Sequence, residues 1–173
     1  MRYGGVSVCH RDSFALRRRV AVVFPEPLLL DTTVLGNVLT GLRLRGVPRG
    51  EARRRAGAWL SRLGIAHLAH RSVRHLSGGE ARRVSLARAF ALEPEVLFLD
   101  EPFTALDYPT RCTLRRELGG LLRETGVTTL FITHDYRDLP GLAHRVAVME
   151  GGRVVQLGTP EDVLSRWPAG GFP

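Results

Sequence analysis

Residues 96–101 read VLFLDE, four apolar residues followed by two carboxylates. The apolar run predicts a strand of a parallel sheet that is buried on both faces. Ligands bind at the carboxyl ends of such strands, which is where Asp100 and Glu101 would lie. A strand can also end in two acids simply because the chain re-enters solvent. In phosphoryl transfer, however, each acid has a task, since Asp100 can hold a Mg²⁺ shell and Glu101 can polarise the attacking water.

A second strand pattern ends in a histidine. Residues 128–132 read TTLFI, which predicts another buried strand, and His134 follows it closely. A single histidine in such a place is most often a loop or capping residue. The order and spacing of Asp100, Glu101 and His134 nevertheless favour one site, because parallel strands end at the same edge of a sheet.

Residues 76–80 read LSGGE, at the start of a helical pattern. Ser77 and Glu80 have the spacing of a capping box, which by itself explains both residues. The two glycines, Gly78 and Gly79, favour a further interpretation. Without side chains, they would let backbone N–H groups approach a phosphate at the positive end of the helix.

The remaining patterns alternate between strands and helices. A strand is predicted at 20–24, helices at 50–63, 79–91 and 109–124, a hairpin at 145–149 and 153–157, and a short helix from 159. We expect an α/β fold, with an α/β core made of residues 1–27 and 91–173 and a helical subdomain at residues 28–90.

The composition is strongly basic, with a net charge of +8 over 173 residues and no lysine, so all 25 basic residues are arginines. The arginines are scattered over helical patterns with few aromatic residues between them, which favours a solvated or membrane-facing surface over nucleic-acid binding. Cys9 and Cys112 have neither metal nor disulfide spacing, so we expect reduced thiols and a cytosolic chain.

Taken together, these motifs resemble the ATP-binding subunit of ABC transporters over nearly the whole chain. The LSGGE segment is similar to the ABC signature, VLFLDE to Walker B, Ala105-Leu106-Asp107 to the D-loop, and His134 to the H-loop. The resemblance implies a P-loop NTPase core that is incomplete here, with a helical subdomain. It also implies ATP and Mg²⁺ as cofactors.

In this family two such domains sandwich ATP between the Walker A loop of one subunit and the signature of the other. The implied roles are catalytic for Glu101 and His134, nucleotide-binding for Ser77, Gly78, Gly79, Glu80 and Asp107, and metal-binding for Asp100. The implied partners are membrane permease subunits and a second ATP-binding subunit, with no nucleic acid. The implied location is the cytoplasmic face of the cell membrane, as a peripheral subunit.

Two departures from the family pattern stand out. The phosphate loop, Gly-x-x-x-x-Gly-Lys-[Ser/Thr], does not occur in a chain without lysine; Gly41 and Gly46 have the glycine spacing, but Val47 and Pro48 follow. Pro25 stands where the family has the glutamine of its Q-loop. We therefore expect this chain, by itself, neither to bind MgATP tightly nor to hydrolyse it.

Residues 2–9 resemble the strand that follows the Walker A helix in complete family members, so we expect a truncated chain, with the missing motif encoded upstream in the DNA. Residues 24–47 resemble the segment that faces the membrane partner in oxyanion importers of the tungstate or molybdate kind. The alternative is a catalytically inactive interaction protein that lends its signature to a partner ATPase. Asp100, Glu101 and His134 count against it, because they act with a Walker A loop of their own subunit.

Overall fold

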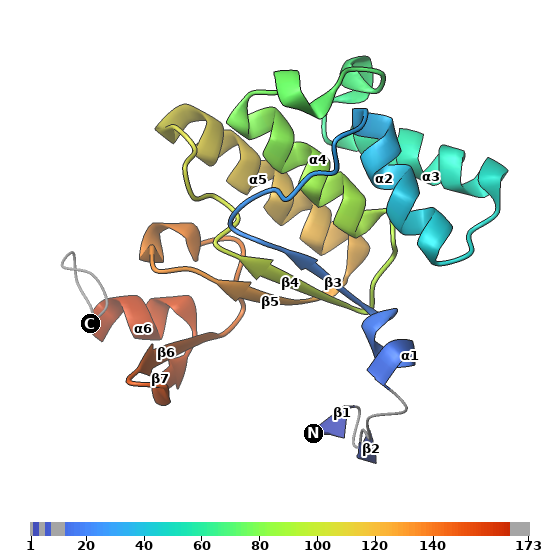
Figure 1. Cartoon of the computed structure of the whole chain (residues 1–173). Coiled ribbons are helices and arrows are strands. Elements are labelled where there is room, and N and C mark those ends of the chain that lie inside the picture. Colours follow the sequence, from blue (N-terminus) through green and yellow to red (C-terminus); the bar gives the residue numbers. More distant parts are fainter. Residues whose placement is uncertain (1, 4–5, 8–12, 167–173) are drawn as a thin grey trace.

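The centre of the fold is a parallel sheet, seen in a computed structural model that describes residues 2–3, 6–7 and 13–166 (Figure 1). Its order is β3 (Val20–Val23), β4 (Val96–Asp100) and β5 (Thr128–Ile132). Both pairs of strands are parallel, and Asp100 at the end of β4 pairs with Ile132 at the end of β5. The polar residues that follow these two strands therefore emerge at one edge of the sheet.

Helices cover one face of this sheet, where Figure 1 shows α2, α3, α4 and α5 gathered on the same side. The residues of β3 and β4 on this face are buried in one core with the helices: Ala21, Val23, Leu97 and Leu99. Burial of these side chains is the main force that joins the sheet to the helices.

The opposite face of the sheet is exposed among the described residues. Val22 is 41% exposed, Leu130 50% and Ile132 46%, and Phe98 is only half-buried. The prediction that residues 96–99 are buried on both faces is therefore wrong, and so is the prediction that residues 128–132 form a buried strand. Because side chains of a strand alternate between faces, helices on one side bury only every second residue.

The predicted helical region is present between β3 and β4. It contains α2 (Val34–Leu44), α3 (Arg49–Arg62), the 3₁₀ turns η2 (Ala66–Leu68) and η3 (Val73–His75), and α4 (Gly78–Phe90). The apolar face predicted for α3 packs inward, and Trp59 stacks on Phe90 of α4 with ring centroids 4.8 Å apart. No helix in the described part of the chain is long and apolar enough to cross a membrane.

Helix α5 (Tyr108–Thr125) runs between β4 and β5. It begins after the capping residue Asp107 and ends at Gly126, whose φ of +61° is the left-handed conformation that glycine adopts at little cost. Both boundaries agree closely with the prediction from the sequence.

The chain after β5 forms a small unit of its own. The turn η4 (Tyr136–Asp138) leads to the predicted hairpin of β6 (Val146–Glu150) and β7 (Arg153–Gly158), and α6 (Pro160–Arg166) follows. Its separate core consists of Leu139, Val146, Val148 and Val163.

The N-terminal segment differs from the single strand expected over residues 2–9. Its described residues form a short antiparallel pair, β1 (Arg2–Tyr3) and β2 (Val6–Ser7), and α1 (Ser13–Arg17) precedes β3. Gly-Gly pairs favour two-residue hairpin turns, and the sequence has such a pair at positions 4 and 5, a signal that the prediction of one strand did not use. Cys9 lies outside the described residues.

Candidate functional site

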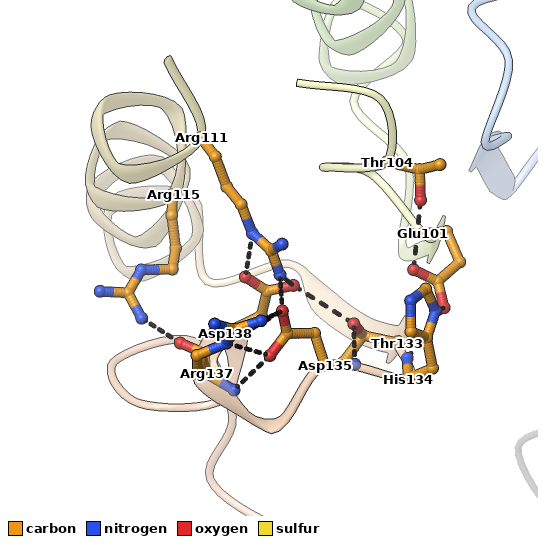
Figure 2. A network of polar contacts seen from close by, with 9 residues as sticks. All are labelled: Glu101, Thr104, Arg111, Arg115, Thr133, His134, Asp135, Arg137 and Asp138. Carbon is orange, nitrogen blue, oxygen red and sulfur yellow. Dashed lines mark hydrogen bonds and ion pairs between the residues drawn. The ribbon is translucent and has the colours of Figure 1, made fainter. Parts of the chain in front are cut away.

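Glu101 and His134 meet at the edge where β4 and β5 end (Figure 2). Oε1 of Glu101 lies 2.6 Å from Nδ1 of His134 and also accepts the backbone N–H of His134 at 2.8 Å. The other carboxylate oxygen accepts a hydrogen bond of 3.3 Å from the hydroxyl of Thr104. The structure thus brings together the two residues to which the sequence assigned the catalytic work.

The backbone explains this contact. The N–H of Glu101 donates to the carbonyl of Ile132 at 3.0 Å, which continues the pairing of β4 with β5 past the last strand residue. Glu101 itself has a φ of +46°, a left-handed conformation that is uncommon outside glycine and is concentrated at functional sites.

The contact also bears on the orientation of the imidazole. Because carboxylate oxygens accept hydrogen bonds, the contact suits the His134 tautomer with its proton on Nδ1, and in that tautomer Nε2 is left for another partner. The His134 side chain is 81% exposed, whereas that of Glu101 is 22% exposed. The histidine can therefore reach a ligand at this edge while the carboxylate stays anchored.

Asp100 lies half-buried at the end of β4, and no hydrogen bond or ion pair of its carboxylate is found within the described ranges. No group of three or more His, Cys, Asp or Glu residues that could hold a metal occurs among the residues that the structure describes. Mg²⁺ is usually bound by one or two carboxylates together with phosphate oxygens and water. Asp100 therefore fits a Mg²⁺ ion that arrives with a phosphate ligand.

A second group of predicted residues lies at the start of α4. Ser77 caps the helix by accepting the N–H of Glu80 at 3.3 Å, and Glu80 accepts the N–H of Ser77 at 2.7 Å. This reciprocal pair is the predicted capping box. The hydrogen bond from the backbone of Ser77 lowers the pKa of Glu80, so the carboxylate stays ionised.

An open groove of about 520 Å³ lies between the start of α4 and the start of α5. Its lining includes all five predicted nucleotide-binding residues, Ser77, Gly78, Gly79, Glu80 and Asp107. A Cβ atom at Gly79 would lie 2.9 Å from Cγ2 of Thr110, so glycine allows the two helix starts to approach closely, whereas a Cβ at Gly78 would meet nothing within 4 Å. The groove can accept a phosphate at the positive end of α4.

Asp107 is fixed at the other side of this groove. Its carboxylate accepts the N–H of Thr110 at 3.0 Å and the hydroxyl of Thr110 at 2.8 Å. These hydrogen bonds, that from the backbone first, lower the pKa of Asp107. Because Asp100, Glu101 and His134 do not line this groove, the predicted residues fall into two separate groups.

Two arginines of α4 were not singled out from the sequence. Arg82 is 2% exposed and donates to the carbonyls of Phe24, at 2.5 Å, and Pro25. Arg88 donates to the carbonyl of Leu28 at 2.9 Å. The prediction that arginines of these helices form a solvated surface is wrong for Arg82, whose burial lowers its pKa.

Helix periodicity was the signal that could have identified Arg82. It precedes the buried Ser85 by three residues and the buried Ala89 by seven, so it lies on the inward face of α4. The carbonyl groups of Phe24 and Pro25 accept from the two terminal nitrogens of Arg82, while its buried Nε has no hydrogen-bond partner among the described residues. In this way the arginines of α4 hold the loop of residues 24–28, which contains Pro25.

Arg111 of α5 was also missed, and it holds the segment after His134 (Figure 2). Its guanidinium donates to Asp138 at 3.0 and 2.7 Å and to Asp135 at 2.7 Å. The side chains of Asp138 and Asp135 are only 4% and 10% exposed. The pKa of Asp135 is lowered to about 2, and the hydrogen bonds from the side chain of Arg137 are the largest cause.

Comparison with known proteins identifies the class. The family profile described as "ABC transporter" matches residues 2–104, more than half of the chain. The chain therefore belongs to the ABC transporter family, as its motifs predicted.

Two relatives are ATP-binding proteins of import systems. The spermidine/putrescine import ATP-binding protein PotA of Frankia alni is 46% identical over 151 residues, covering 87% of this chain and 32% of that protein. The molybdate/tungstate import ATP-binding protein WtpC of Pyrococcus horikoshii is 44% identical over 134 residues, covering 78% of this chain and 39% of that protein. The chain thus spans less than half the length of either relative.

A solved structure confirms the predicted α/β fold. The chain resembles cbiO1 from Clostridium perfringens, part of the ABC transporter complex cbiONQ, with a TM-score of 0.87 and 30% sequence identity. The likeness covers 96% of this chain and 68% of that one.

Proposed function

We propose that this chain is the ATP-binding part of an ABC importer subunit, which couples ATP hydrolysis to solute uptake. The observation that carries the proposal is the contact between Glu101 and His134 at the edge of the sheet, 2.6 Å between carboxylate and imidazole. Phosphoryl transfer needs a residue that orients the attacking water and a donor that can approach the terminal phosphate. Glu101 and His134 are suited to these two tasks.

The other predicted residues have complementary tasks in this proposal. Asp100 contributes an oxygen to the Mg²⁺ that accompanies ATP. The groove at Ser77, Gly78 and Gly79 receives the terminal phosphate of a nucleotide held by a second ATP-binding subunit, because it lies apart from Glu101 and is open. Asp107, at the same groove, connects the two nucleotide sites of the pair.

The partners proposed are that second subunit and membrane permease subunits, at the cytoplasmic face of the membrane. Residues 1–27 and 91–173 form the α/β core in this proposal, and residues 28–90 the helical subdomain. The two relatives import different solutes, polyamines and molybdate or tungstate. The oxyanion class proposed for the solute therefore depends on residues 24–47 alone.

We propose further that this chain is inactive by itself, since it contains no lysine for a phosphate loop and has Pro25 in place of an amide side chain. A purified preparation is expected to show no saturable binding of a fluorescent ATP analogue at micromolar concentration and no release of phosphate. ATP hydrolysis that Glu101→Gln abolishes would contradict this expectation.

The second candidate function is a catalytically inactive partner that lends its signature groove to another ATPase. This candidate is favoured by the combination of an open groove at Ser77, Gly78 and Gly79 with the absence of lysine from the chain. The test adds this chain to an ABC ATPase that has a phosphate loop but a defective signature. A rise in turnover that Gly78→Ala removes and Glu101→Gln leaves intact supports this candidate, because Ala at 78 adds a methyl group to the lining of the groove without a clash. Loss with Glu101→Gln as well contradicts this candidate, because a chain that only lends its groove does not use its own Glu101.

A further inference from the structure

A second cavity lies between α5 and the loop at Pro140 and Gly141, and it shares no residue with either group of site residues. Its volume is about 300 Å³. Its lining on α5 consists of Cys112, Arg115, Arg116, Gly119 and Arg123, so three arginines and no acidic residue of the described chain line it.

Helix spacing creates this arrangement. Arg116, Gly119 and Arg123 follow one another at three- and four-residue intervals, and Arg115 precedes Gly119 by four residues, so all four lie along one side of α5. Gly119 forms the floor, because a Cβ there would lie 3.1 Å from the carbonyl oxygen of Gly141 and 3.4 Å from Nη1 of Arg123. Any larger residue at 119 would fill the cavity.

Carbonyl groups orient two of the guanidinium groups without neutralising them. Arg123 donates from Nη1 to the carbonyl of Gly141 at 3.2 Å, and Arg115 donates from Nη1 to the carbonyl of Arg137. A guanidinium has several N–H donors in a fixed fork, so most donors of both residues stay available. Arg116 is exposed and has no hydrogen bond or ion pair within the part of the chain described.

The acidic residues near this face are already paired. Asp135 and Asp138 are bound by Arg111, Glu117 by Arg83, and Glu124 by Arg62. The positive charge of the cavity is therefore uncompensated by the described carboxylates. Arginine forks match the geometry of tetrahedral oxyanions, which they bind through charge-assisted hydrogen bonds.

We propose that this cavity binds an oxyanion of phosphate or sulfate size, either free in solution or as the phosphate of a lipid headgroup. The ligand bridges α5 to the loop at Pro140 and Gly141. This loop follows the segment that carries His134. Because the anion binds only the folded chain, it stabilises the fold by mass action.

The test uses the full chain fused to a soluble carrier, with the carrier alone as blank. Inorganic phosphate is titrated at constant ionic strength, and two readouts are followed: the thermal unfolding midpoint and the rate at which iodoacetamide alkylates Cys112, measured on the peptide that contains it. Phosphate is expected to raise the midpoint in proportion to the logarithm of its concentration, as a ligand of the folded chain does. It is also expected to slow alkylation several-fold to a plateau, because Cys112 lines the occupied cavity.

Variants locate the effect. Arg116→Ala removes a charge that holds no other group, and it is expected to weaken phosphate binding about tenfold, the value of one charge-assisted hydrogen bond. Arg53→Ala removes an exposed arginine of α3 and is the matched control. Equal weakening by both variants, or no saturation with phosphate or with lipid, overturns the proposal.

Vesicles distinguish the two sources of the anion. Binding to phosphatidylcholine vesicles only when they contain phosphatidic acid, lost in Arg116→Ala and kept in Arg53→Ala, assigns the site to a headgroup. Binding of free phosphate with the same dependence on Arg116 assigns it to a soluble oxyanion.

Discussion

Arg111 shows what one side chain contributes to this structure. It satisfies two nearly buried carboxylates, Asp135 and Asp138, that Arg137 and Thr133 satisfy only in part. Its removal would leave buried charge without its partner, and that loss is among the costliest effects of a point mutation. The same contact joins α5, which begins beside Asp107, to the segment that carries His134.

We expect Arg111→Met to lower the free energy of unfolding by about 3 kcal/mol, the lower end for a broken buried pair, because the Arg111 side chain stays 26% exposed. Urea denaturation measures the change. Arg116→Met, on the same helix but without a partner among the described residues, is the control and should change stability little. A loss at 111 no larger than that at 116 would show that the ion pairs contribute nothing.

Asp135 makes the stability of the chain depend on acid pH. Its pKa is lowered from 3.8 to about 2 in the folded chain, so its contribution is present above the unfolded pKa and is lost as pH falls from about 4 through about 2. The difference in unfolding free energy between the wild type and Asp135→Asn should therefore shrink as pH falls over this range, by an amount on the order of 2 kcal/mol. Unfolding midpoints in urea at several pH values test this, and parallel curves for the two proteins would contradict it.

At the scale of elements, α4 begins at a capping box whose two residues, Ser77 and Glu80, also line the groove between the starts of α4 and α5. Ser77 thus has a structural role in addition to the binding role proposed for it. The structural part can be measured without nucleotide, because the cap is present in the chain alone.

We expect Ser77→Ala to cost about 1 kcal/mol of unfolding free energy, the usual effect of losing a side-chain cap. Chemical denaturation measures it. Ser61→Ala, at an exposed position of α3 without a side-chain cap, is the control and should cost little. An unchanged free energy of unfolding in Ser77→Ala would show that the capping hydrogen bond of Ser77 does not stabilise the chain.

At the scale of the molecule, the uncovered face of the sheet is the main liability. Val22, Leu130 and Ile132 are each more than 40% exposed, and β5 is an edge strand of the described sheet. Exposed apolar edges promote association between chains.

We therefore expect the chain, when expressed alone without a carrier, to be poorly soluble, and the pair Leu130→Thr and Ile132→Thr to reduce its association. Light scattering after size exclusion tests both points. Leu44→Gln, which removes an exposed leucine of α2 that is not part of the sheet, is the control. A monodisperse wild-type monomer with a sharp, cooperative melt would contradict the expectation.

The sequence by itself determined the class of fold, the element boundaries around α3, α4 and α5, and the family. These follow from local information, namely hydrophobic period, capping residues and short motifs. It also predicted that Glu101 and His134 end neighbouring strands, because parallel strands present their carboxyl ends at one edge.

Only the tertiary structure decided what covers each surface. Burial of a strand face depends on the elements packed against it, so the one-sided exposure of β5 is not written in residues 128–132. The partners of Arg82 and Arg111 come from segments 24 or more residues away in the chain. The arginine-lined cavity has the same cause, since α5 supplies the charges but the loop at Pro140 and Gly141 closes the space around them.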